Sequence, residues 1–193
     1  MTNDDEPTPA AAPPGPNPLP AVSVVGPDEG EKIVLGTTRM RILEDGSTTG
    51  HRLALAESVL APHTPGPPLH RHAEHDEGFY VISGSVRFTV ASGHVDAPAG
   101  TLVMVPPGAA HSFANVTDHP AVMLSTFTPD LYVQYFRDLE HHVTTTPPPP
   151  TLMTRYATTT AEDEEGERAG HDQGAGRARK SADGGNGPNG ARQ

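Results

Sequence analysis

The sequence contains no cysteine, which limits the kinds of site that the protein can form. Without thiols the chain has no disulfides, and zinc fingers and iron–sulfur clusters are excluded. Any metal ion must therefore be held by histidine, carboxylate or water. Tryptophan is absent as well, and the aromatic residues are five Phe and four Tyr.

Long apolar runs are also missing. No stretch approaches the ~18 residues that a membrane-spanning helix needs. The first twenty residues are acidic and rich in proline, whereas a signal peptide has a basic start followed by an apolar segment. We therefore expect a cytoplasmic protein without a membrane partner.

Acidic residues outnumber basic ones at both ends of the chain. Residues 1–31 contain six acids and no base, and residues 161–193 contain seven acids against five bases. The rest of the chain has 11 acids and 8 bases, so most of the net charge of −11 belongs to the ends. A central charge of −3 is ordinary, and the acidity argues mildly against a nucleic-acid partner.

The same two ends lack the large apolar residues of a folded core. Residues 1–30 contain eight prolines, and residues 161–193 are charged, glycine-rich and free of aromatic side chains. Neither segment buries enough apolar surface to offset the entropy lost on ordering. We predict a disordered, Pro-rich acidic arm at 1–30 and a disordered tail at 161–193.

Between the ends, many short segments are typical of β-strands. They alternate apolar with polar residues or are rich in branched and aromatic ones, and glycine or proline separates them. They lie at residues 32–44, 51–61, 70–72, 78–84, 85–90, 101–105, 111–116 and 121–129. Strands at this spacing predict an all-β sandwich or barrel. A helix is expected over 130–142, and residues 144–160 are expected to form a linker with a short docking segment.

Eight residues from His70 to Glu77 contain three histidines and three acids. Packing alone does not explain this density, so we interpret it as a metal site. Alternate residues of a strand share a face, so His70 and His72 point the same way. Glu77 would begin the return strand, and the intervening acids and His75 fall in a polar turn that is expected to face water.

A further ligand has to come from another part of the chain. His111 follows the rigid turn Pro106–Gly108 and begins a strand on which Phe113 shares its face. The imidazole is therefore expected beside an apolar wall.

The first of these groups resembles a motif of the cupin family. His70–His72 is followed by four residues, Glu77, six residues and Gly84. The leading glycine of the motif is usually six residues before the first histidine. Here Gly66 is four residues before it, and Thr64 stands at the usual position.

The second group resembles the second cupin motif with every spacing kept. Gly100 is followed by five residues, Pro106–Gly108, two residues, His111, three residues and Asn115. Two independent spacings that agree are a specific signal. The layout is similar to that of single-domain bacterial cupins of the quercetin-dioxygenase-like type.

This resemblance implies a cupin (jelly-roll) β-barrel with one C-terminal helix over residues 31–143. It also implies four metal ligands, namely His70, His72, Glu77 and His111. The cofactor would be one divalent transition metal per subunit, and this ligand set suits Fe, Mn, Ni, Co, Cu or Zn without distinguishing them.

The resemblance further implies a metal-dependent dioxygenase of a small aromatic or enolisable (flavonol-like) substrate, with Glu77 as the catalytic base. The residues leave open a metal-dependent isomerase, cyclase or decarboxylase, and also a non-catalytic small-molecule-binding protein. Apolar side chains of the barrel are candidates for the substrate pocket or for the core. These are Phe79, Phe88, Met104, Phe113 and Met123.

Tyr80 and Ile82 have the opposite parity to Phe79 and yet are also apolar. A strand with two apolar faces is covered on both sides. The strand 32–44, the helix 130–142 or a second subunit could provide the outer cover, and we predict a homodimer.

Overall fold

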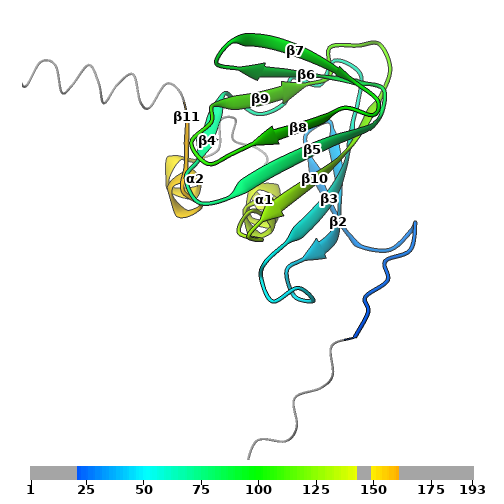
Figure 1. The fold of residues 1–193 in the computed structure, drawn as a ribbon, viewed down its shortest axis with the longest axis vertical. Helices are drawn as coiled ribbons and strands as arrows, with labels where there is room; N and C mark the ends of the chain where they lie inside the picture. Colours follow the sequence, from blue (N-terminus) through cyan, green and yellow to red (C-terminus); the bar gives the residue numbers. More distant parts are fainter. Residues whose placement is uncertain (1–20, 143–148, 161–193) are drawn as a thin grey trace, which may run out of the picture.

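The computed structural model of the protein describes residues 21–142 and 149–160. The predicted tail at 161–193 and residues 1–20 of the predicted arm lie outside these ranges. Within them, eleven strands form two antiparallel sheets and are accompanied by two helices (Figure 1). The all-β fold predicted from the sequence is confirmed.

The strands fall into a larger and a smaller sheet. The larger sheet has the order β1-β2-β3-β10-β5-β8 and the smaller one the order β11-β4-β9-β6-β7. The strands of the larger sheet are β1 (Glu31–Leu35), β2 (Thr38–Asp45), β3 (Ala54–Leu60), β10 (Ala121–Thr128), β5 (Asp76–Ser83) and β8 (Leu102–Val105). Those of the smaller sheet are β11 (Thr158–Thr160), β4 (His70–His72), β9 (His111–Ala114), β6 (Ser85–Val90) and β7 (Gly93–Pro98).

Strand β10 shows how the sequence produces the larger sheet. Its buried residues are Ala121, Met123, Ser125 and Phe127, and the residues between them are half-buried. This alternation gives one face to the interior and the other to the outside. Because β10 pairs with β3 on one side and with β5 on the other, its inward side chains lie in the middle of the core.

The core consists of two clusters along the inner face of the larger sheet. One cluster joins that face to the smaller sheet, with Phe79 and Met123 on one side and Phe88 on the other. The other cluster joins it to the helices, with Phe127 and Phe136 in contact at a ring distance of 5.5 Å. One half of the core is therefore sheet on sheet, and the other half is helix on sheet.

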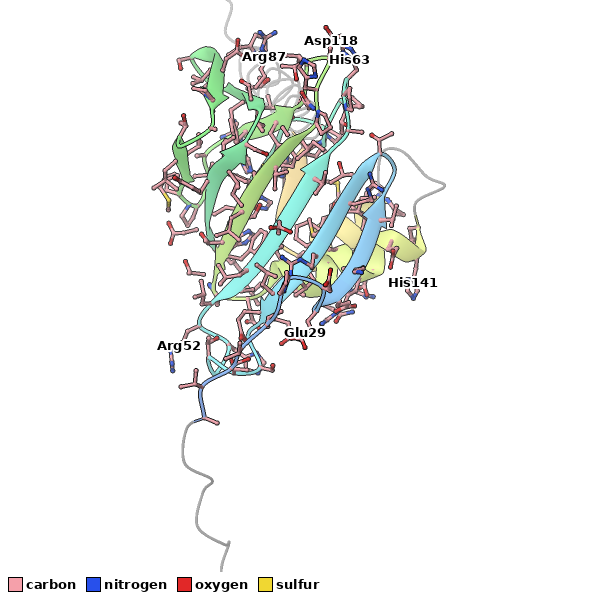
Figure 2. All side chains as sticks on the ribbon, turned by 90° about the vertical axis from the view of Figure 1, so that its right-hand side faces the viewer. Glu29, Arg52, His63, Arg87, Asp118 and His141 are labelled. Atoms are coloured by element: carbon pink, nitrogen blue, oxygen red, sulfur yellow. The ribbon has the colours of Figure 1, made fainter. Side chains whose placement is uncertain are left out.

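Helix α1 (Tyr132–His141) covers the second half of the inner face. Its buried residues Tyr132, Val133, Tyr135 and Phe136 follow the spacing of one helix face. Figure 2 looks onto the outer side of β1, β2 and β3, with α1 behind them. No helix among the described residues is long and apolar enough to cross a membrane.

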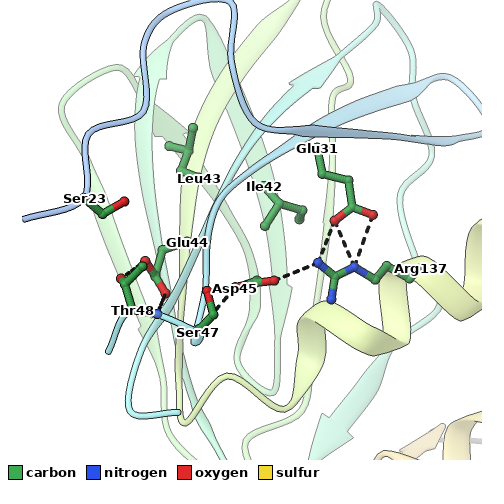
Figure 3. Close-up of a pocket in the computed structure, with 9 residues that line it drawn as sticks. All are labelled: Ser23, Glu31, Ile42, Leu43, Glu44, Asp45, Ser47, Thr48 and Arg137. Atoms are coloured by element: carbon green, nitrogen blue, oxygen red, sulfur yellow. Dashed lines mark hydrogen bonds and ion pairs between the residues drawn. The ribbon is translucent and has the colours of Figure 1, made fainter. Parts of the chain in front are cut away.

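An ion-pair network fixes α1 to two strands (Figure 3). Arg137 on α1 lies 2.6 Å from a carboxylate oxygen of Glu31 on β1 and 2.9 Å from one of Asp45 on β2. Hydrogen bonds from Ser47 and from Arg137 lower the pKa of Asp45 to about 2. The carboxylate therefore stays ionised at neutral pH, and the network holds the helix across the edge of the sheet.

The segment 32–44, predicted as one strand, forms the two paired strands β1 and β2, and two further strands were not predicted. Strand β7 is exposed except for Ala97 and pairs only with β6, so its sequence lacks the apolar alternation of a covered strand. Strand β11 consists of three threonines and follows helix α2 (Pro150–Arg155). The expected docking segment corresponds to α2, whose Leu152 and Met153 are buried.

The loop before β4 contains a glycine that the structure requires. Gly66 has a φ of +71°, and a Cβ atom there would lie 1.6 Å from the carbonyl oxygen of Phe113. Thr64, at the usual motif position, instead donates a side-chain hydrogen bond to Ala61 and bonds to Thr37. Gly66, which is displaced from the usual motif position, thus allows this loop to lie close to β9.

We expect Gly66→Ala to lower the free energy of unfolding by about 3 kcal/mol, because it combines backbone strain with a backbone clash. Gly100→Ala is the matched control, since Gly100 also has a positive φ of +88° but no atom within 4 Å of the added Cβ. It should cost about 1 kcal/mol. Equal losses in denaturant unfolding would contradict the close contact.

Candidate metal centre

Three strands bring the four proposed ligands together. His70 and His72 form the ends of β4, Glu77 is the second residue of β5, and His111 is the first residue of β9. His70 and His111 are register partners across the pair β4–β9. All four are buried, with at most 7% of any of them exposed. The strand parity seen in the sequence places the imidazoles on one inner face.

A carboxylate oxygen lies beside two of the imidazoles. Glu77 Oε2 is 3.1 Å from Nε2 of His72 and 3.1 Å from Nε2 of His111. Ligand atoms of His70, His72 and His111 lie within 4.8 Å of one another. Two atoms that are each about 2.1 Å from one ion, at a right angle, are about 3.0 Å apart. These separations suit a single ion.

Backbone carbonyls hold two of the rings from behind. His70 Nδ1 donates to the carbonyl oxygen of Pro68 at 2.8 Å, and His111 Nδ1 donates to that of Ala109 at 3.1 Å. A carbonyl only accepts, so Nδ1 carries the hydrogen in both rings. In the neutral form of each ring, Nε2 then carries a lone pair that points to the centre, as a metal ligand must.

The hydroxyl of a threonine holds the ring of His72 from behind in the same way. His72 Nδ1 lies 3.3 Å from Thr158 Oγ1 on β11, and that hydroxyl donates to the carbonyl oxygen of Tyr156 at 3.1 Å. Since its one hydrogen is used there, Thr158 can only accept from His72. The hydroxyl of Tyr132 also lies 3.1 Å from Thr158 Oγ1 and donates to it. Thr158 thus fixes the His72 ring with its Nε2 lone pair inward.

The charge states of these groups are those that metal binding needs. Burial alone would raise the pKa of Glu77, but contacts with His111 and His72 outweigh it and lower the pKa to about 2. Burial, followed by the neighbouring His111 and His72, lowers the pKa of His70 to about 4. At neutral pH the carboxylate is ionised and the His70 ring is neutral.

A buried nitrogen atom without a hydrogen bond also indicates that these residues suit a metal ion. His72 Nε2 is buried and makes no hydrogen bond of acceptable geometry within the described part of the chain, although Glu77 is near. When both rings are neutral, their Nε2 lone pairs repel the carboxylate of Glu77 unless a cation lies between them. The three imidazoles are positioned for metal binding, and their Nε2 atoms would be the ligands.

His75 was expected to face water, and this expectation is wrong. The residue is 2% exposed, and its ring centroid lies 4.3 Å from that of His72 and 4.7 Å from that of Tyr132. Helix α1, which is distant in sequence, covers the turn and turns the ring inward. Burial and then His72 lower the pKa of His75 to about 4. Its ligand atoms, with those of His72 and Glu77, form a second group within 4.8 Å.

A cavity of about 440 Å³ lies beside this centre, at the junction of the two core clusters. His70 and Glu77 lie in its wall. Tyr132, Tyr135 and Phe136 of α1 also line the cavity, whose surface is mainly apolar. The cavity therefore connects the candidate metal centre to a space that is large enough for a small organic molecule.

Three of the five predicted pocket residues line this cavity, namely Phe79, Phe113 and Met123. Phe88 does not line it. Its ring lies 5.4 Å from Phe79 and 6.2 Å from Phe113, and the residue is fully buried in the core between the sheets. The sequence also allowed Phe88 to be a core side chain, and the structure shows this role.

Met104 was also expected in the pocket, and the structure contradicts this. It is the register partner of Gly78, which lies between the inward-facing Glu77 and Phe79, so Met104 points to the opposite face. The residue is 58% exposed on the outer side of the larger sheet. The sequence identified the strand but not which of its two faces is inside.

The sequence analysis did not identify Thr158, because a run of three threonines shows neither apolar alternation nor metal-ligating side chains.

We expect Thr158→Val to weaken metal affinity by about 10–100-fold, since the hydrogen-bond acceptor that orients His72 is lost while the side-chain shape is kept. The affinity can be measured by competition with a chromogenic chelator.

Thr159→Val is the matched control for this substitution, because Thr159 is the exposed neighbour on the same strand. It should leave the affinity unchanged. A Thr158→Val variant that binds metal as tightly as Thr159→Val would rule out the role of the hydroxyl in orienting His72.

A family model described as the Cupin domain matches residues 56–127. No curated protein matches the chain.

Several solved structures share the fold at low sequence identity. A cupin-superfamily sugar phosphate isomerase from Silicibacter pomeroyi is 22% identical, with a TM-score of 0.50 over 55% of this chain and 75% of that chain. The polyketide cyclase RemF from Streptomyces resistomycificus is 20% identical, with a TM-score of 0.51 over 56% and 80%. A predicted oxalate decarboxylase from Thermotoga maritima is 23% identical, with a TM-score of 0.51 over 55% and 99%. Residues 56–127 thus match the model of the cupin domain, and the described chain shares the fold of these cupin structures.

Proposed function

We propose that this protein is a metal-dependent oxidoreductase, a dioxygenase that acts on a small aromatic or enolisable substrate of the flavonol type. The observation that carries the proposal is the position of the buried His70 and Glu77 in the wall of a mainly apolar cavity of about 440 Å³. A substrate in this cavity would reach the ligand centre with its oxygen atoms and pack its carbon skeleton against aromatic side chains.

His70, His72, His111 and Glu77 would hold one divalent transition metal. Three neutral donors and one anionic donor suit Fe, Mn, Ni, Co, Cu or Zn. The bound ion would act as a Lewis acid that lowers the pKa of a hydroxyl group on the substrate. Because the rings are fixed from behind through Nδ1, the chain needs no rearrangement to present these ligands.

Glu77 is the group that we propose as the base. Its pKa of about 2 means that it is ionised at neutral pH, so it can accept a proton. The same low pKa makes it a weak base, so it takes a proton only from a hydroxyl whose own pKa is lowered. Tyr132 cannot compete for this role, because burial raises its pKa well above 10 and keeps it protonated.

The aromatic walls would exclude water from the reacting atoms. Phe79 and Phe113 lie 5.5 Å apart by ring centroid, and Phe79 lies 6.1 Å from His111. An apolar surface next to the ligands strengthens electrostatic interactions within the site and limits side reactions. The same surface favours a substrate whose body is apolar.

A second candidate function uses the metal ion but not molecular oxygen. The polyketide cyclase of the same fold has a TM-score of 0.51, and its name describes chemistry on a carbon skeleton. An isomerase, cyclase or decarboxylase would use the same ligands and Glu77, with the ion polarising a carbonyl group. A non-catalytic binding protein would hold the metal and a ligand without turnover.

Metal content and oxygen uptake together test these functions. We expect purified wild-type protein to hold about one transition metal ion per subunit and to consume oxygen with flavonol, enediol or catechol substrates. His72→Ala should lose most of the metal and the activity, because a ligand is removed. Elemental analysis and an oxygen electrode give the two readings.

His94→Ala is the matched control, because His94 is exposed on β7 and bonds only to Thr89 among the contacts described. It should keep both metal and activity. Metal-dependent turnover without oxygen uptake would replace the dioxygenase by the second candidate. A wild-type protein that is free of metal after careful preparation would rule out every metal-dependent function.

We also propose that the protein is a homodimer that uses the outer face of the larger sheet. The face near β5 and β8 exposes four large apolar residues, each between 45% and 59% exposed, namely Tyr80, Ile82, Leu102 and Met104. The segment before β1 covers a different part of this face, where Arg41 donates to the carbonyl oxygens of Gly26 and Glu29. An uncovered apolar patch of this kind is typical of a protein interface.

The double substitution Leu102→Glu and Met104→Glu should convert the dimer to a monomer, because charges would be buried at the interface. Light scattering coupled to size-exclusion chromatography measures the mass directly. Glu substitutions at Val22 and Val24, which are also exposed, are the control and should leave the mass unchanged. A wild-type monomer at 50–100 µM, roughly the range of weak dimers, would contradict the proposal.

A further inference from the structure

The four ligands of the candidate metal centre do not include the buried ring of His75, although this residue lies beside them. His75 comes two residues before Glu77, so an extended chain directs both side chains to the inner face at the start of β5. His70 and His72 have the same spacing at the two ends of β4. Two neighbouring segments of the chain therefore each carry a pair of buried side chains that can bind a metal ion.

One ring nitrogen of His75 is unpaired. The ring lies between those of His72 and Tyr132, with centroid distances of 4.3 Å and 4.7 Å. Its Nε2 atom is buried and has no hydrogen-bond partner in the part of the chain that the structure describes. Native structures leave few buried polar atoms without a partner, so this nitrogen indicates a bound group that is absent from the chain itself.

The neighbours of His75 are those of a three-ligand metal site. Ligand atoms of His72, His75 and Glu77 lie within 4.8 Å of one another. One carboxylate oxygen of Glu77 is 3.1 Å from Nε2 of His72, which is about the separation of two donors at a right angle around one ion. Two imidazoles and one carboxylate form a donor set that suits Fe, Co and Zn.

This group is distinct from the three imidazoles of the candidate metal centre. His70, His72 and His111 form one group within 4.8 Å, and His75 is outside it. Two donors that are each about 2.1 Å from one ion are at most about 4.2 Å apart. An ion bound to His75 therefore lies at a different point from one bound to His70 and His111. Because Nε2 of His72 binds one ion at a time, the two points are alternatives.

From these observations we propose that His72, His75 and Glu77 form a second, alternative position for a divalent transition metal ion. An ion occupies it when His70 and His111 do not hold the ion. Of its three residues only Glu77 lines the cavity, so the second position keeps an ion in the chain but presents it less to a molecule in the cavity. The second position shares two ligands with the proposed function, but it depends on neither the substrate nor oxygen.

Cobalt binding to the full chain tests the second position after the first has been removed. In the double variant His70→Ala and His111→Ala, the residues His72, His75 and Glu77 are the three donors that remain. We expect this variant to bind one Co²⁺ per chain. Its visible absorption spectrum should differ from that of cobalt-loaded wild type, because the donors and their arrangement differ. Competition with a chromogenic chelator measures the affinity.

The substitution His75→Phe isolates the contribution of His75. Phenylalanine keeps an aromatic ring between His72 and Tyr132 but offers no donor atom. Added to the double variant, it should weaken Co²⁺ binding by about 100-fold or more, because loss of a ligand costs at least as much as loss of a group that orients one. In the otherwise wild-type chain it should leave the affinity almost unchanged, because the first position is intact.

His141→Phe is the matched control, because His141 is exposed at the end of α1 and belongs to neither group (Figure 2). Added to the double variant, it should leave Co²⁺ binding unchanged. Equal affinity of the double variant with and without His75→Phe would overturn the second position, and it is the result expected if water alone bonds to His75. A large loss of affinity caused by His75→Phe in the wild-type background would also overturn it, because His75 would then be a ligand of the first position.

A second measurement needs no substitution at His75. Electron paramagnetic resonance of Cu²⁺ bound to the double variant should show two nitrogen donors, those of His72 and His75, and a single nitrogen donor would overturn the proposal. These readings are separate from the proposed function. That function fails if metal-loaded wild type takes up no oxygen with any substrate, whereas the second position fails only through the metal binding of the variants.

Discussion

The burial of one carboxylate among three imidazoles is the constraint on which the rest of the structure depends. Glu77 is 3% exposed and stays ionised, so its charge must be balanced by neighbours within a few ångströms. The rings of His72 and His111 turn their Nε2 atoms toward it because their Nδ1 atoms are held elsewhere. Both Nε2 atoms lie 3.1 Å from one carboxylate oxygen of Glu77, and a cation bound between these atoms would balance its charge when the rings are neutral.

The division of the core explains why an open space lies next to this group. Over β5 and β10 the smaller sheet packs directly on the larger one, with Phe88 filling the gap. Over β2 and β3 the cover is α1, whose Tyr135 and Phe136 reach the sheet from a helix. A helix and a sheet present surfaces of different spacing, and the cavity lies where the one kind of packing changes to the other.

The strands and the ligand spacing could be predicted because both are local properties. His70, His72 and Glu77 lie within eight residues, so strand parity and one turn suffice to bring them together. The burial of His75 and the outward position of Met104 depend on α1 and on the choice of sheet face, and neither is encoded nearby. Sequence patterns give the period of a strand, but the partner that covers each face is set by distant packing.

The end of the described chain belongs to the site although it lies outside the matched cupin domain at 56–127. Strand β11 pairs with β4, with Thr158 opposite His72, and so covers the free edge of the three-residue strand that holds two of the imidazoles. Met153 of α2 lines the cavity next to α1. Residues 56–127 thus contain the four proposed metal ligands, whereas the segment after them holds the ring of His72 and contributes Met153 to the cavity wall. Proteins that share the barrel can therefore differ in chemistry through this segment while keeping the same donor set.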